Sequence, residues 1–361
     1  MLLLLETLSS VPARGEKSPA AHNRRVSLFA FAPSRGPRWP LATQAALGIA
    51  APIAVMTLLG MAPLGYIAAS GAFTVLFAGS AAVVDRARIL PFVALGLILC
   101  AALGVLVSGN DWLVSIGVVL VAIASAALAF GFRLGPPGPL FFVLVFGLSA
   151  HVVGAGSISP VVYVAALAAG CVFSYLVAMT PLLLPRTRAV DARALRVLLP
   201  GPALTADSRL LLLRVAIVAV LGVLLGLVID PERTYWIVGS AIAVIGVAAA
   251  RRAAFQRGLH RMLGTVVGAG VYVLLSLLHP NGLWLALLLG ALQFTIELVV
   301  VRHYALALVF ITPLVLLLTG AATGSIGSLD VALERIIDTI VGAALGAASG
   351  LLHPRASPVR D

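Results

Sequence analysis

Apolar residues occur along this chain in long runs, and short polar breaks, often with proline or glycine, separate one run from the next. Most runs reach the roughly 17–25 residues that a helix needs to cross a bilayer. We therefore predict an all-α, polytopic membrane protein with about twelve transmembrane helices, at residues 41–59, 64–84, 89–107, 112–132, 139–153, 161–184, 210–229, 234–250, 259–278, 283–301, 304–319 and 331–352.

The runs fall into two sets of six, and short sequence matches indicate a duplication. LVF occurs at 144–146 and 308–310, and Pro-Arg closes both sets. An even number of spans starts both halves on the same side, which predicts two parallel six-helix repeats. The predicted organisation is a disordered basic tail (1–38), a first repeat (39–185), a cytoplasmic linker (186–208), a second repeat (209–355) and a C-terminal tail (356–361).

The composition excludes a soluble protein. Hydrophobic residues make up 61% of the 361 residues and charged residues only 10%, whereas soluble domains carry about 25% charged residues. With twelve spans, 22 of the 24 Lys and Arg residues fall on the side of the termini, and only Arg233 and Arg335 fall opposite. Basic residues gather in cytoplasmic loops. We therefore expect cytoplasmic termini, and the net charge of +11 needs no nucleic-acid partner.

A basic segment at residues 251–261 leads into a glycine-rich run. Arg257 and Arg261 are four residues apart and share one face of the predicted helix, with His260 beside them. A helix start adds free N–H groups and a partial positive charge. The segment is therefore a candidate site for an anion arriving from the cytoplasm. The alternative is that these residues bind membrane lipid headgroups.

Two threonines and several aromatic residues are further candidates for substrate contact. Thr265 follows the basic segment, and Thr312 precedes Pro313, which frees a backbone carbonyl and bends the helix. A bend in mid-membrane can line a substrate cavity, although many such bends are only structural. Four aromatic residues could stack on a ring-bearing substrate or anchor the chain at the interface: Trp236, Phe255, Phe294 and Tyr304.

Glu297 and Asp338 are the acids that the pattern places well inside predicted spans. A carboxylate there is costly and usually faces a cavity, a partner or a proton route, so both are candidates for proton coupling. Each has a structural alternative. Asp338 can form an ion pair with Arg335, and Glu297 can pair with a cytoplasmic arginine such as Arg302 or Arg257.

Glycines recur every four residues in two predicted spans, a spacing that places them on one helix face. They are Gly264 and Gly268 in one span, and Gly342, Gly346 and Gly350 in the other. Small residues on one face allow close helix packing.

The sequence gives no indication of an enzyme. It contains no Walker loop, no HExxH and no GxSxG. The cysteines, Cys100 and Cys171, lack the spacing of metal ligands. We expect no catalytic residues, no metal and no cofactor.

Three segments together resemble a known family: QRGLHRMLGTVVGAG, ELVVVRHYALALVFITPL and ERIIDTIVGAALG. Their order, mainly within residues 210–355, is similar to the fusaric acid resistance-like membrane family, which includes aromatic acid exporters. The first segment carries the pattern R-x3-R-x2-GT-x2-G and the third carries R-x2-DT-x2-G. The resemblance implies a protein of the bacterial inner membrane that exports small organic, often aromatic, acids. Related plant malate channels leave a passive channel open as an alternative.

The chain departs from full-length aromatic acid exporters, which carry a large cytosolic domain between the two membrane halves. Here only residues 185–208 join them. Our leading hypothesis is a proton-coupled exporter of small organic anions. The alternatives are a passive anion channel and a membrane scaffold or accessory subunit of an envelope assembly. The expected partners are a small organic acid and membrane lipid, and a homo-oligomer is left open.

Overall fold

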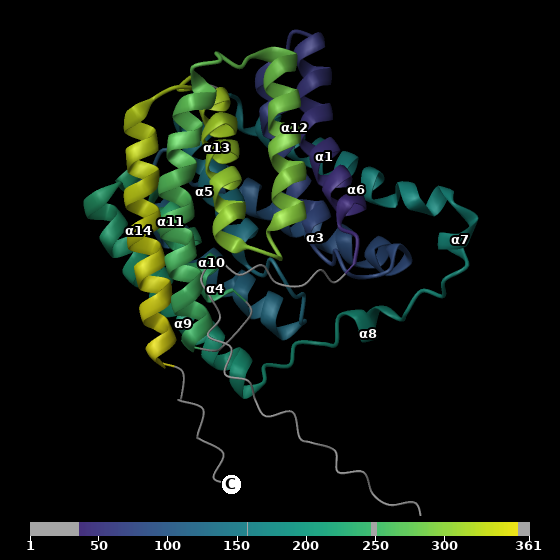
Figure 1. The fold of residues 1–361 in the computed structure, drawn as a ribbon. Coiled ribbons are helices and arrows are strands. Elements are labelled where there is room, and N and C mark those ends of the chain that lie inside the picture. The colour runs from purple at the N-terminus through teal and green to yellow at the C-terminus, as the bar shows by residue number, and fades with distance from the viewer. Residues whose placement is uncertain (1–35, 157, 247–250, 353–361) are drawn as a thin grey trace, which may run out of the picture. The chain divides into compact units, whose positions relative to one another are not determined.

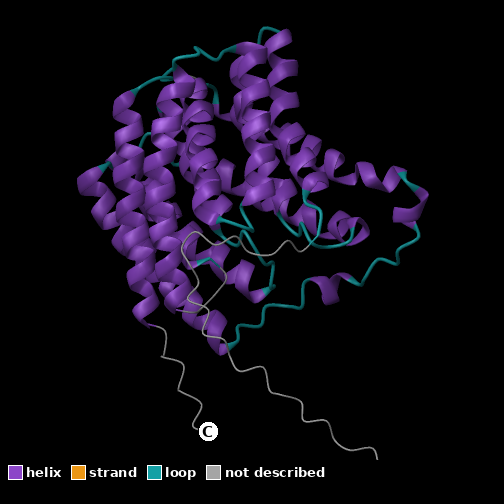
Figure 2. Ribbon diagram, viewed as in Figure 1, coloured by secondary structure: helices purple, strands orange, loops and turns teal. Residues whose placement is uncertain are grey.

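The computed structural model describes residues 36–156, 158–246 and 251–352 of the chain. Within these ranges the regular secondary structure is entirely helical (Figure 2). This confirms the predicted all-α class. The helices meet one another mainly through apolar and small side chains, and large apolar residues such as Leu120 and Leu224 remain exposed on their outer faces. An exposed apolar surface of this kind requires lipid around it.

The first half begins at α1 and the second at α9, with a linker between them (Figure 1). The first half comprises α1 (Trp39–Leu58), α2 (Ala62–Ala69) with the 3-10 helix η1 (Ser70–Leu76), α3 (Val83–Leu106), α4 (Asp111–Gly131), α5 (Leu140–Gly154), α6 (Pro160–Met179) and η2 (Thr180–Leu183). The linker carries α7 (Pro185–Arg188) and α8 (Leu195–Leu198). The second half comprises α9 (Ala206–Ile229), η3 (Pro231–Arg233), α10 (Thr234–Ile245), α11 (Arg251–Ser276), α12 (Gly282–Val299), α13 (Tyr304–Thr323), α14 (Leu329–Ser349) and η4 (Gly350–Leu352).

Nine helices of the described residues are long and apolar enough to cross a membrane. Three of the twelve predicted spans are shorter: residues 62–76, α5 and α10. A helix of 12 residues, such as α10, is only about 18 Å long, against a hydrocarbon thickness of about 30 Å. The chain is a multi-pass membrane protein, and the count of twelve spans stays a prediction.

Corresponding helices make corresponding contacts in the two halves. α1 packs on α2 as α9 packs on α10, α3 packs on α5 as α11 packs on α13, and α3 packs on α6 as α11 packs on α14. Two parallel repeats would produce this pairing, and the duplication itself stays a prediction.

The linker is largely exposed and is tied to the start of α3. Arg193 Nε lies 2.9 Å from Asp85 Oδ2, and Arg88 Nη1 donates to the Arg193 carbonyl at 2.6 Å. Asp85 is buried, so the ion pair satisfies a carboxylate that would otherwise be costly at this position.

The short helix α10 organises the second half. All of its residues are buried, because α14, α9 and α5 pack around it. The helix ends at Gly246, whose φ of +58° is in the range that favours glycine. α10 therefore presents both of its ends to the interior of the protein, where polar residues of its neighbours can reach them.

Candidate functional site

Arg261 on α11 lies in the interior, where it faces α10 and α13. The residue is 6% exposed. Its Nη1 donates to the Tyr304 hydroxyl at 3.0 Å, and its Nη2 donates to Ser240 Oγ at 3.2 Å. Its Nε has no hydrogen-bond acceptor within the described residues. The salt bridges of the described residues do not include Arg261. Within the described residues, the Arg261 guanidinium is therefore hydrogen-bonded only to neutral oxygen atoms.

Arg257 lies one helical turn before Arg261 and contacts the same tyrosine. Its guanidinium carbon is 5.1 Å from the centroid of the Tyr304 ring, within the range of a cation–π interaction. The guanidinium also covers Gly246, where an added Cβ would come within 2.8 Å of Arg257 Nη1. We call Arg257, Arg261, Tyr304 and Ser240 the arginine cluster. It brings together the two arginines that the sequence predicted as an anion site.

His260, the third residue of that predicted site, faces a different neighbour. Its ring stacks on His303, with centroids 5.5 Å apart. His303 also caps α13, because its Nδ1 accepts from the Leu306 backbone N–H at 3.1 Å. The ring of His260 therefore lies against the start of α13.

Arg335 on α14 is buried and lies over an aromatic ring. Its guanidinium carbon is 4.7 Å from the Trp236 ring centroid, and Arg233 approaches the same indole at 5.6 Å. The described salt bridges do not include Arg335 and Asp338, although the two charges interact electrostatically. The predicted ion pair stays a prediction, and the contact that the structure gives the Arg335 guanidinium is the Trp236 ring on α10.

Carboxylates gather at the N-terminal end of α10. Arg233 Nη1 is 3.4 Å from Asp230 Oδ2 and also forms an ion pair with Glu334. Burial alone would lower the pKa of Arg233, but the adjacent Asp230 and Glu334 outweigh it and raise that pKa above its ordinary value. Asp338 lies on α14, one turn beyond Glu334. We call Asp230, Glu334 and Asp338, with Arg233, the acidic cluster.

Glu297, predicted as a proton-coupling residue, lies elsewhere in the structure. Its Oε2 is 2.9 Å from Arg38 Nη2, and its backbone carbonyl accepts from Arg38 Nε at 2.8 Å. Gln293 donates to Oε1 at 3.3 Å. Glu297 therefore connects α12 to the start of α1, and these partners include neither arginine of the arginine cluster.

Replacing Glu297 by glutamine should destabilise the contact between α12 and α1. Arg38 keeps 30% of its side chain exposed, so water can solvate it after the loss, and we expect a decrease of about 1–2 kcal/mol in unfolding free energy. Arg38→Gln should cost a similar amount, and the double variant clearly less than the sum of the two. Thermal unfolding in detergent measures all three. Additive losses would show that the two side chains do not interact energetically.

Thr312, one of the two predicted threonines, lies in the packed interface between α11 and α13. Both are buried, and the Thr312 hydroxyl donates to the Leu308 carbonyl of its own helix at 2.9 Å. An added Cβ at Gly268 would come within 2.8 Å of Thr312 Cβ. Neither Thr265 nor Thr312 lines the pockets described next, so the geometry gives them a packing position.

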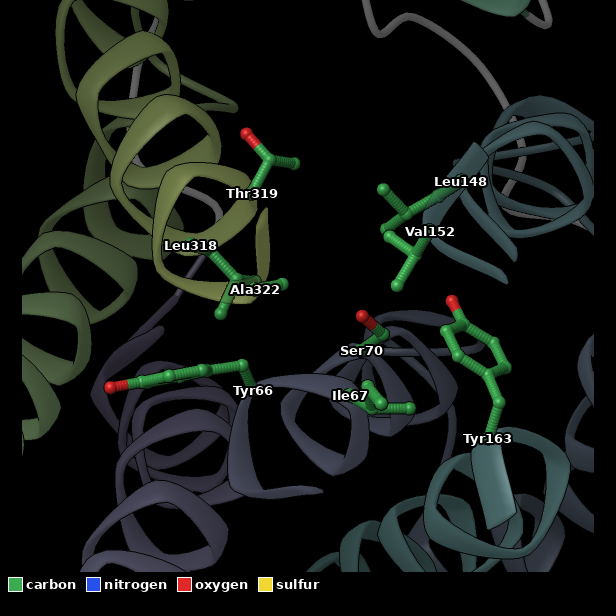
Figure 3. Close-up of a pocket in the computed structure, with 9 residues that line it drawn as sticks. All are labelled: Tyr66, Ile67, Ser70, Leu148, Val152, Tyr163, Leu318, Thr319 and Ala322. Atoms are coloured by element: carbon green, nitrogen blue, oxygen red, sulfur yellow. The ribbon is translucent and has the colours of Figure 1, made fainter. Parts of the chain in front are cut away.

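Two small pockets adjoin each other between α5 and α13. One contains about 240 Å³ of empty space and lies between the two halves (Figure 3). In Figure 3 the Tyr163 hydroxyl points into it from α6. The second contains about 260 Å³ and reaches the acidic cluster. Thr319 lines both. The first is lined by Tyr66, Ile67, Ser70, Leu148, Val152, Tyr163, Leu318, Thr319 and Ala322, and the second by His151, Arg233, Tyr235, Trp236, Thr319, Thr323, Ser325 and Val331.

The predicted glycine faces bring the backbones of neighbouring helices together. An added Cβ at Gly264 would meet the Ala305 carbonyl oxygen of α13 at 2.4 Å. At Gly342 it would meet the Ile237 carbonyl oxygen of α10 at 2.2 Å, and at Gly346 the Ala241 oxygen at 2.6 Å. Gly350 is less tight, with its nearest contact 3.2 Å away at Ala254 Cβ.

The part of the chain that holds these clusters matches a known family. Residues 216–349 fit the family described as fusaric acid resistance protein-like. The resemblance predicted from the sequence is confirmed over this stretch. The chain is also 33% identical over 114 residues to an uncharacterized membrane protein, YvaC, of Bacillus subtilis, and the alignment covers 32% of this chain and 18% of YvaC. No solved structure matches the chain.

Several residues of the two clusters were not predicted as site residues from the sequence. Ser240 lies in an apolar run and belongs to no motif. Arg38 is 259 positions from Glu297, so no local pattern connects these two residues. For Asp230 and Arg233 the sequence did contain an indication of a special position. Asp230 precedes Pro231 at a predicted helix boundary, and Arg233 and Arg335 were the two basic residues expected on the outer side.

Proposed function

We propose that this protein exports small organic anions, aromatic carboxylates among them, across the bacterial inner (plasma) membrane. The family match supports a role in membrane transport. The observation that carries the proposal is the buried guanidinium of Arg261, whose described partners are two neutral hydroxyls. A buried charge without a counter-charge costs several kcal/mol, and an anion that binds beside it recovers much of this cost.

Arg261 binds the carboxylate in this proposal, and Arg257 and Tyr304 complete the site. Arg257 adds a second positive charge, and the cation–π contact fixes Tyr304 beside it. The Tyr304 ring and the two planar guanidinium groups offer flat surfaces on which an aromatic acid can stack. The anion enters from the cytoplasm, where the positive-inside pattern places the start of α11.

The exit lies along α10 towards the pocket that contains Trp236 and Thr319. Movement is coupled to protons in this proposal, because a proton that enters the negatively charged cytoplasm releases free energy that can drive an acid outwards against its own concentration gradient.

Benzoate flux into proteoliposomes under an imposed pH gradient tests the proposal. We expect flux well above that of protein-free liposomes. Arg261→Gln should weaken the apparent affinity about 10- to 150-fold, which corresponds to the roughly 1.5–3 kcal/mol of a hydrogen bond to a charged group. Arg252→Gln is the matched control, because Arg252 is exposed on the same helix and its loss changes the net charge equally.

The outcomes separate the alternatives. Absence of benzoate flux in the wild-type protein would contradict transport of this class of substrate and favour a scaffold. Flux that follows the benzoate gradient alone, without response to pH, would favour a passive channel. Equal effects of the two arginine substitutions would show that net charge, and not the arginine cluster, matters for binding.

A further inference from the structure

We propose that Arg86 and Gln44 form a second anion-binding site, in the first half of the protein, and that it holds a compact inorganic anion such as chloride. The site is separate from the arginine cluster, and it does not depend on the proposed export. Three features support it: the neutral partners of Arg86, the donors left free beside it, and an arrangement that the two halves share.

Arg86 on α3 is a buried cation whose described hydrogen-bond acceptors are neutral. The residue is 4% exposed. Its Nη1 donates to Gln44 Oε1 on α1 at 2.9 Å, and its Nη2 donates to the Val75 carbonyl of η1 at 2.8 Å. The salt bridges of the described residues do not include Arg86. A buried charge without a counter-charge is costly, so binding of an anion beside it is favoured.

The polar groups left without a partner at this position are donors. Arg86 Nε–H has no acceptor within the described residues. Gln44 accepts from Arg86 through its oxygen, so its amide N–H groups remain as donors. Ser174 on α6 has a buried hydroxyl without a partner in the described part of the chain. It faces α1 at Gly48, one helical turn after Gln44, where an added Cβ would lie 3.1 Å from Ser174 Oγ. Free donors around a buried cation recruit an anion.

Capping of η1 explains only part of this arrangement. Val75 lies in the last turn of η1, where backbone carbonyls lack partners within the helix, and Arg86 Nη2 supplies one. A helix C-terminus carries a partial negative charge of about half an elementary charge. This is less than the charge of the guanidinium, and the cap leaves the Nε–H group unused. A positive charge and a free donor therefore remain for a ligand.

The charged side chains at the start of α3 leave this region positive. Asp85 precedes Arg86, but its carboxylate is bound to Arg193, whose backbone N–H and Nε each donate to it at 2.9 Å. Arg88 is exposed two residues after Arg86 and donates to the Arg193 carbonyl. Among these four side chains the positive charges exceed the negative one, so an anion that approaches this end of α3 is attracted.

The second half contains the same arrangement. In each half a short, largely buried helix precedes the long helix that carries the arginine: η1 precedes α3, and α10 precedes α11. The arginine of the long helix reaches back to the short one, as Arg86 does to Val75 and as Arg261 does to Ser240. Arg86 thus occupies in the first half the place that Arg261 occupies in the second.

The two sites differ in what surrounds the guanidinium, and this difference sets the class of anion. Arg261 lies beside Tyr304, which offers a ring. Arg86 contacts an amide and a backbone carbonyl, and the cation–π contacts of the described residues do not include it. α1 and η1 also pack closely one turn away, where an added Cβ at Gly48 would come within 3.0 Å of Ala72 Cβ. Fixed N–H donors without a ring surface suit chloride better than an aromatic carboxylate.

Thermal unfolding of the purified protein in sodium chloride and in sodium gluconate, at equal ionic strength, tests the site. An anion that binds only the folded protein raises the unfolding temperature once its concentration exceeds Kd. We expect the wild-type protein to unfold about 2 °C or more higher in chloride than in the bulky gluconate. Arg88→Gln is the matched control and should keep this difference, because it removes the same charge from an exposed position of α3.

Gln44→Glu is the decisive variant. Its carboxylate has nearly the shape of the amide, still accepts from Arg86, and supplies the missing negative charge from within the protein. In gluconate this variant should unfold at or above the temperature of the wild-type protein, and it should lose the chloride effect because the built-in carboxylate replaces and repels the anion. Arg86→Gln should lose the effect as well. If Arg86→Gln does not fold, Gln44→Glu still decides the question.

Anomalous X-ray scattering from crystals grown in bromide locates the anion, and we expect a peak within hydrogen-bonding distance of Arg86 Nε. Absence of a chloride effect in the wild-type protein would overturn the proposal, as would an effect that persists in Gln44→Glu or a bromide peak at the arginine cluster alone. Loss of the effect in Arg261→Gln, with persistence in Gln44→Glu, would assign the anion to the arginine cluster. These measurements need no transport, so they decide the second site even if the wild-type protein moves no benzoate.

Discussion

Replacing Gly342 by alanine is expected to remove most of the folded protein from a detergent extract. The added Cβ would lie 2.2 Å from the Ile237 carbonyl oxygen and 2.7 Å from Ser240 Cβ. Both atoms belong to α10, which is buried on all sides, so the clash cannot be relieved by turning one side chain. Overpacking typically costs about 1–3 kcal/mol and sometimes more, and contact with backbone places this case at the upper end.

Gly346→Leu should be at least as harmful, since even a Cβ at this position meets Ala241 O at 2.6 Å and Val244 Cβ at 2.8 Å. The matched control is Gly270→Ala on α11, where an added Cβ has no neighbour within 4 Å. There alanine should be neutral or stabilising by up to about 1 kcal/mol, because it favours the helix. Size-exclusion profiles and thermal unfolding in detergent measure both effects. Equal yields for Gly342→Ala and Gly270→Ala would contradict the packing of α14 on α10.

Cysteine labelling in intact cells is expected to give an all-or-none difference between the two sides of the membrane. The distribution of basic residues predicts a cytoplasmic linker and an outer position for the loop before α10. In a background without Cys100 and Cys171, Glu232→Cys should react with a membrane-impermeant reagent. Ala206→Cys should react only with a permeant one. Both positions are exposed, so access to the reagent is the only difference between them.

The predicted orientation of the termini depends on this result. Labelling of Ala206→Cys by the impermeant reagent would contradict a cytoplasmic linker and the twelve-span topology. Failure of Glu232→Cys to react before cell lysis, with reaction after it, would place the acidic cluster on the cytoplasmic side. The predicted disordered tails, residues 1–38 and 356–361, lie outside the described residues except for residues 36–38.

The membrane helices could be predicted because their cause is local. A run of apolar residues must leave water wherever it lies in the chain, so α1, α4 and α12 appear within a few residues of the predicted spans. The helix α10 shows the limit of this reasoning. Its sequence continues to be apolar after Gly246, but the positive φ of that glycine ends the helix, and burial on all sides allows it to be short.

The candidate site was predicted in part for the same reason. Arg257 and Arg261 share a helix face by spacing alone, and the structure brings both to Tyr304. Glu297 and Asp338 were recognised as buried acids because an acid in an apolar run is conspicuous. The partner of Glu297 was not predictable, since Arg38 comes from a distant part of the chain and a pairing between helices depends on their rotation and register.

The sequence by itself therefore determined that this is a helical membrane protein, that Glu297 and Asp338 carry acids into its interior, and which glycines allow close packing. These properties follow from transfer free energy and helical spacing, which act within one segment. Only the tertiary structure decided that Glu297 binds Arg38, that Arg335 lies over Trp236 and that Arg233 binds Glu334. Those choices depend on which helix faces meet around α10, and packing between distant segments settles them.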